Sequence, residues 1–178
     1  MKNRLLLGSV AVLSIINVVK FTTFPVFAQE EPKLSEEKRG LISQNCGTIR
    51  QSLKNLQRSD SRARIYFGSI YETFSSHYLT PLNLRLVKND ISEVSLINSQ
   101  ATLAELREKF STHFIDYSKS LEDLIAHDCR LDPDGFYVKL QSTRTKRAKV
   151  AADTTSLNDL LVSSVKSVEK LKEQYHEK

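Results

Sequence analysis

The hydrophobic pattern of the chain is that of long amphipathic helices. Between residues 42 and 74, apolar side chains recur at alternating steps of four and three positions, with one polar interruption at Asp60. This spacing places the side chains on one helix face, in the heptad pattern of coiled coils. A long helix with a single narrow apolar stripe needs other helices to cover it. The stripe consists of Ile42, Cys46, Ile49, Leu53, Leu56, Ala63, Phe67, Ile70 and Phe74.

Two later segments repeat this spacing. The first runs from Leu103 to Cys129, and the second runs from Phe136 to Tyr175. In the second segment, polar or small residues occupy several positions of the apolar stripe, so we expect this helix to pack less tightly than the other two. These positions are Thr143, Arg147, Thr154 and Ser164.

The patterns predict an all-α fold with long helices at about residues 36–79, 92–129 and 133–176. The first two would form an antiparallel hairpin, and the third would complete a coiled-coil-like three-helix bundle. Pro81 predicts the end of the first helix, because proline breaks a helix interior. We therefore interpret residues 81–90 as an ordered, non-helical cap over one end of the bundle.

The beginning of the chain has the features of an export signal. Basic residues precede an apolar run over residues 5–19, and Val26 and Ala28 supply small side chains at the positions that a signal peptidase reads. The run is shorter than the about 20 residues that cross a bilayer. We predict a signal peptide at residues 1–28, cleaved after Ala28, and an exported protein without an integral membrane span. An uncleaved N-terminal anchor is the alternative.

The rest of the chain suits a single domain. The 178 residues are 40% hydrophobic and 26% charged, which is the balance of a folded globular protein. We expect a flexible lead at residues 29–34 and one helical domain at residues 35–178. Its location would be extracytoplasmic: periplasmic, at the cell envelope or secreted.

The only two cysteines are placed to form one bond. Cys46 and Cys129 would meet in an exported protein, because an oxidising compartment pairs cysteines. If the first turn lies around residues 80–95, the arms from Cys46 to Leu79 and from Leu96 to Cys129 have equal length, which brings both sulfurs to the same end of an antiparallel hairpin. The sequence therefore predicts a Cys46–Cys129 disulfide, against the alternative of two unrelated buried thiols.

The positive charge of the chain is concentrated in one short stretch. The net charge of +5 falls to +2 without residues 1–28, which contain three basic residues and no acid, so the overall charge does not lead us to expect nucleic acid as a partner. Residues 144–149 hold four basic side chains and no acid. With arginines at comparable heights on the first helix, they could bind an anionic envelope polymer, a lipid headgroup or nucleic acid; a solvated helix face is the alternative. The candidate residues are Arg144, Lys146, Lys149, Arg62 and Arg64.

One pair of charges falls on the apolar stripes themselves. Asp60 and Arg147 are each the only charged residue on the stripe of their helix, and they lie at similar distances from the two cysteines. We predict an ion pair between them inside the bundle, which would fix the register of the helices more than it would add stability.

No pattern of catalytic or metal-binding residues is recognisable. The chain lacks the two Glu-x-x-His motifs of di-iron bundles, the His-Glu-x-x-His and Gly-x-Ser-x-Gly motifs of hydrolases, and a glycine-rich phosphate loop. We therefore predict no catalytic residues, no metal and no cofactor. The histidines are interpreted as solvated residues on helix surfaces: His77, His113, His127 and His176.

Several short motifs resemble a pattern in exported helical proteins of small-genome, uncultivated bacterial lineages. The resemblance covers roughly residues 45–150, and it implies an extracytoplasmic helical fold with a cysteine pair. It implies no activity and no site residues. The motifs are Asn45-Cys46, Leu56-Gln57, Asp60-x-Arg62-x-Arg64, Tyr71-Glu72, Pro81-Leu82-Asn83-x-Arg85-Leu86-Val87-x-Asn89, Cys129 and Phe136-Tyr137.

The function expected from these features is non-enzymatic. The leading hypothesis is an extracytoplasmic helical scaffold or adaptor that binds a protein partner, or a second copy of itself, at the cell envelope. The second hypothesis is a module that binds anionic ligands through residues 144–149. A clamp that holds client chains between the helix ends is a third.

Overall fold

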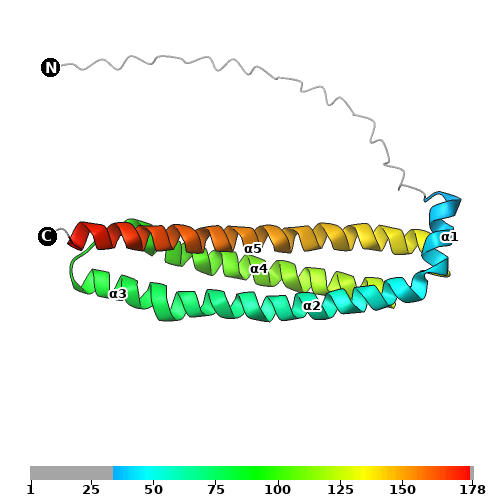
Figure 1. Cartoon of the computed structure of the whole chain (residues 1–178), viewed down its shortest axis with the longest axis horizontal. Helices are drawn as coiled ribbons and strands as arrows, with labels where there is room; N and C mark the ends of the chain where they lie inside the picture. The colour runs from blue at the N-terminus through cyan, green and yellow to red at the C-terminus, as the bar shows by residue number, and fades with distance from the viewer. Residues whose placement is uncertain (1–33, 177–178) are drawn as a thin grey trace, which may run out of the picture. The chain divides into compact units, whose positions relative to one another are not determined.

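The computed structural model describes residues 34–176, and these residues form an all-helical fold without strands. The predicted signal peptide, and the predicted flexible lead up to residue 33, lie outside the described residues. The helices are α1 Glu36–Gln44, α2 Cys46–Thr73, the π-helical turn η1 Phe74–Leu79, α3 Thr80–Lys88, α4 Val94–Ala126 and α5 Pro133–His176. Helices α2, α4 and α5 run lengthwise beside one another (Figure 1).

The first helix differs from the single element that the sequence predicts. It breaks at Asn45, whose side-chain amide donates a hydrogen bond to the Leu41 carbonyl at 2.8 Å and so ends α1. The separate α1 contacts the start of α5. Arg39 makes an ion pair with Asp134 at 2.9 Å, and the Ser43 hydroxyl donates to the Arg130 carbonyl at 3.2 Å. These contacts hold α1 against the end of the fold that contains the cysteines.

The predicted helix end at Pro81, and the non-helical cap at residues 81–90, are wrong. The chain passes through η1 and stays helical to Lys88, with Pro81 in the first turn of α3. Proline is tolerated there because the N–H groups in the first turn of a helix have no carbonyl partner within that helix. The turn itself comes at Asn89 and at Asp90, which has a φ of 57°.

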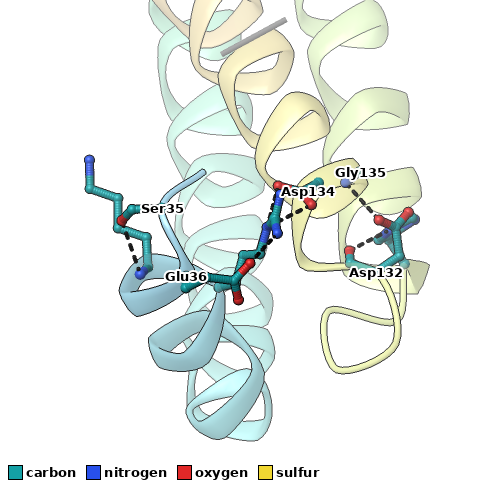
Figure 2. Close-up of polar contacts among 8 residues, drawn as sticks. Ser35, Glu36, Asp132, Asp134 and Gly135 are labelled. Atoms are coloured by element: carbon teal, nitrogen blue, oxygen red, sulfur yellow. Dashed lines mark hydrogen bonds and ion pairs between the residues drawn. The ribbon is translucent and has the colours of Figure 1, made fainter. Parts of the chain in front are cut away.

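The second predicted helix is shorter than expected at both ends. Helix α4 ends at Ala126, and Cys129 lies in the loop that follows. In this loop Asp132 accepts a hydrogen bond from the Gly135 backbone N–H at 2.9 Å, which caps the start of α5 (Figure 2). A Cβ atom at position 135 would overlap the Asp132 carboxylate, so glycine is needed for this approach. Helix α5 begins at Pro133, as the sequence predicts.

The core is built around α4, and its closest neighbour is α5. The contact between α4 and α5 is by far the most extensive in the fold, and α2 packs on α4 less extensively. The expectation of loose packing for the third helix is therefore wrong. The reason is that small residues let two helix backbones approach closely: Thr143 and Ser164 are buried, and the Thr143 hydroxyl contacts both the hydroxyl and the carbonyl of Ser120.

Candidate functional site

The two cysteines lie at the distance of a disulfide bond, as the sequence predicts. Their Cα atoms are 5.6 Å apart, and both residues are buried in the core. The bond joins the first residue of α2 to the loop after α4, so it ties together two segments separated by 83 residues.

A groove of about 470 Å³ opens between α2, α4 and α5, and we call it the central groove. Its floor consists of aromatic side chains from α2 and α4, and its walls carry three arginines. The groove exists because alanines from α2 and α5 face it, and their methyl groups leave the space between these helices unfilled. The aromatic residues are Phe67, Phe110, Phe114 and Tyr117, the arginines are Arg64, Arg144 and Arg147, and the alanines are Ala63, Ala148 and Ala151.

The predicted pair of Asp60 and Arg147 forms one end of the central groove. Arg147 donates two hydrogen bonds to the Asp60 carboxylate, at 2.8 and 3.0 Å, and the Tyr117 hydroxyl donates a third at 2.6 Å. The pair is not enclosed as expected, because the Arg147 side chain is 51% exposed while that of Asp60 is 16% exposed. A long arginine side chain can reach a buried carboxylate while its charged end stays partly hydrated.

The hydrogen bonds among Asp60, Arg147 and Tyr117 shift the pKa values of these groups. Burial opposes ionisation of Asp60, but the hydrogen bonds from Arg147 and Tyr117 outweigh that effect and lower the pKa of the carboxyl below its ordinary value. Burial, and then the hydrogen bond to Asp60, raise the pKa of the Tyr117 hydroxyl. At neutral pH, Asp60 is therefore an anion that is fully occupied by its two partners.

The stability of the network should depend on pH. We expect Asp60→Asn to lower the free energy of unfolding at pH 7 by about 1–2 kcal/mol, because the charged hydrogen bonds become neutral ones. A lowered carboxyl pKa stabilises the fold above the ordinary value of 3.8, and this contribution is lost as the pH falls through the lowered pKa. The difference between wild type and variant should therefore shrink below pH 3.8 in urea unfolding curves. A difference that stays constant down to acid unfolding would contradict this assignment.

The other two arginines of the central groove have no carboxylate partner among the described residues. The guanidinium of Arg64 lies 5.1 Å from the centre of the Phe114 ring, a cation–π arrangement. Arg144 is exposed at the wall. Since the only acid that lines the groove is Asp60, and it is already paired, the groove carries a net positive charge.

The structure divides the predicted basic candidates into two groups. Arg64 and Arg144 both line the central groove, although they lie on different helices. Arg62, Lys146 and Lys149 do not line it, so residues 144–149 do not act together at this site. In sequence, the aromatic residues of the floor follow the same apolar periodicity as the core. The signal that could have revealed the groove is the presence of alanines on two helices at the height of the Asp60–Arg147 pair.

Two histidines are not the freely solvated residues that the sequence predicts. The His113 ring nitrogen lies 2.6 Å from the Asp153 carboxylate, which links α4 to α5, and His127 lies 3.1 Å from the Asp132 carboxylate. Both side chains are partly buried. Within residues 34–176, no group of three or more metal-ligating side chains comes together.

A second space of about 510 Å³ lies between the π-helical turn, α3 and α5. It is lined mainly by apolar side chains, with Arg85 and Glu169 as its fully charged residues. Because these two charges have opposite signs, the space has no preference for one sign of ligand charge. The central groove is therefore the more selective candidate site.

The comparisons with known proteins give no relative: no family model, curated protein or solved structure matches the chain. Among the described helices, none combines the length and the apolar character that a membrane span requires.

Proposed function

We propose that this protein is a non-enzymatic extracytoplasmic binding protein. Its three long helices form a coiled-coil-like bundle, and the central groove between them binds an anionic ligand. The observation that carries the proposal is the pair of arginines, Arg64 and Arg144, beside an aromatic floor in a groove whose one acid is already paired. Arginine recognises carboxylate and phosphate groups by paired hydrogen bonds, and an apolar surround strengthens such contacts.

An extracytoplasmic location is part of the proposal. The cysteine pair at disulfide distance is compatible with an oxidising compartment. The test is the intact mass of the protein recovered from an exporting cell, with and without reductant. A mass that begins at Gln29 and gains two hydrogens on reduction would support export and the bond together. A full-length, fully reduced mass would contradict both.

Anion binding can be measured with a fluorescent probe. We expect anilinonaphthalene sulfonate, which combines an anionic group with aromatic rings, to bind the oxidised protein saturably. The double variant Arg64→Glu and Arg144→Glu should weaken this binding by about tenfold or more, because it replaces attraction by repulsion at the groove.

The matched control makes the same change in net charge outside the groove. Arg62→Glu with Lys149→Glu should alter probe affinity by no more than about twofold, since exposed charges at a distance are screened by salt. Thermal unfolding of both variants checks that they fold. Equal losses in the two variants would mean that the probe senses only the overall charge, and the proposed site would be wrong.

A scaffold or adaptor role is the second candidate, and one observation favours it. Four apolar side chains near the turn between α3 and α4 are 45–67% exposed, where a protein partner could cover them. Photo-crosslinking from these positions in an exporting cell should recover the same partner repeatedly, or a second copy of the chain. Recovery of no partner would count against this role. The residues are Leu84, Val87, Val94 and Ile97.

A further inference from the structure

Two contacts between α2 and α5 lie near the ends of the central groove. One end is the Asp60–Arg147 pair, and the other is Tyr71, whose hydroxyl donates a hydrogen bond to the Asn158 side chain at 3.2 Å. On α5 the two contacts are eleven residues apart, which corresponds to about 16 Å along the helix. The groove therefore runs parallel to the helices, with one contact between α2 and α5 near each end.

Polarity changes along the central groove. Arg144 and Arg147 lie at the end formed by the ion pair, and Arg64 follows one helical turn further along α2. Beyond Arg64, the lining residues are uncharged. Phe67 and Phe110 supply the floor there, and Thr154 supplies the wall of α5, while Val150 and Ala151 line the wall at the level of Arg64.

The apolar end is built from packed aromatic rings. The Phe67 and Tyr71 rings stack with their centres 6.1 Å apart, and the Phe110 ring meets Tyr71 edge-on at 6.2 Å. Tyr71 is almost completely buried and its hydroxyl is already bonded to α5. This end of the groove therefore offers an apolar surface that favours hydrocarbon over water.

We propose that the central groove binds a free single-chain amphiphile with a carboxylate head, of the fatty-acid class. The inference rests on the proposed function and specifies its ligand. The carboxylate lies in the arginine-bearing part of the groove, where Arg64 and Arg144 have no acidic partner within the described chain, and the alkyl chain extends over Phe67 and Phe110 toward Tyr71. A polymer with evenly spaced negative charges fits less well, because the residues that line the groove beyond Arg64 are uncharged.

Competition against the fluorescent probe tests this assignment. Dodecanoate should displace anilinonaphthalene sulfonate from the oxidised protein, and its affinity should exceed that of acetate by about a hundredfold, because each buried methylene adds to binding. Dodecanol, which has the chain without the charge, should bind about tenfold more weakly than dodecanoate.

A pair of variants tests whether dodecanoate binds in the central groove or elsewhere on α5. Ala151→Phe fills part of the central groove without changing its charge, so it should weaken dodecanoate binding by about tenfold or more. Ala152→Phe adds the same side chain at an exposed position that does not line the groove, and it should leave the affinity unchanged. If Ala151→Phe unfolds the protein, the smaller Ala151→Val replaces it in the same comparison.

The possible outcomes are distinct. If neither the probe nor dodecanoate binds, the proposed function and this inference both fail. If the probe binds but acetate displaces it as well as dodecanoate does, the groove is an anion site and the fatty-acid assignment is wrong. Binding to phosphatidylglycerol vesicles without binding to monomeric dodecanoate would also overturn the assignment, because the ligand would then be a membrane surface.

Discussion

Loss of the Cys46–Cys129 bond is expected to lower the free energy of unfolding by about 4 kcal/mol. The bond closes a loop between residues 83 positions apart, and a loop of this length greatly restricts the unfolded chain. Urea unfolding of the oxidised protein and of the Cys46→Ala, Cys129→Ala double variant measures the difference. Because marginal domains have only about 5–15 kcal/mol of stability, this would be a large share of the total.

The same experiment has an internal control. The chain contains no other cysteine, so reductant should destabilise the wild type and leave the double variant unchanged. A loss of less than about 1 kcal/mol would indicate that the unfolded chain is already restricted in this region, contrary to the loop-closure argument.

Helix α5 should be as sensitive to core substitution as the other long helices. Leu157 is completely buried, and we expect Leu157→Ala to destabilise the fold by about 3 kcal/mol through lost burial and the cavity that remains. Val162 lies on the same helix but is 55% exposed, so Val162→Ala should cost less than about 1 kcal/mol.

These two variants distinguish tight packing of α5 from the loose packing that its diluted apolar stripe suggests. If Leu157→Ala and Val162→Ala have similarly small effects in urea unfolding, α5 is only weakly docked on α4. A large effect confined to Leu157 supports the close contact between the helices.

The all-helical fold and the pairing of the cysteines could be predicted from the spacing of residues along the chain. Steps of three and four residues define helix faces, and Asp132-Pro133 marks the start of α5 without any knowledge of the other helices. Two arms of equal length were enough to place Cys46 beside Cys129. The Asp60–Arg147 contact followed from the same comparison of distances along the chain.

The features that could not be predicted depend on how helices meet. Pro81 lies inside a continuous helical path because the π-helical turn before it places it at the start of a new helix. Thr143 and Ser164 interrupt the apolar stripe of α5, yet their small side chains permit its close contact with α4. The distance between two helix backbones depends on the residues of both helices, so the pattern of one helix does not predict it.

The central groove is also a feature that the sequence could not predict. Its arginines come from α2 and α5, and its aromatic floor comes from α2 and α4. In sequence, Phe110 and Phe114 are indistinguishable from ordinary core residues. Only the facing alanines, which leave the space open, turn this part of the core into a candidate site.

The most direct test of the central claim is to locate the bound ligand by nuclear magnetic resonance. Backbone amide shifts of the oxidised protein would be followed during titration with dodecanoate. We expect the largest changes at residues 60–67 of α2, 110–117 of α4 and 144–154 of α5. Saturable changes confined to η1, α3 and the end of α5 would place the ligand in the second space. The absence of any saturable change would show that the central groove is only a gap in the packing.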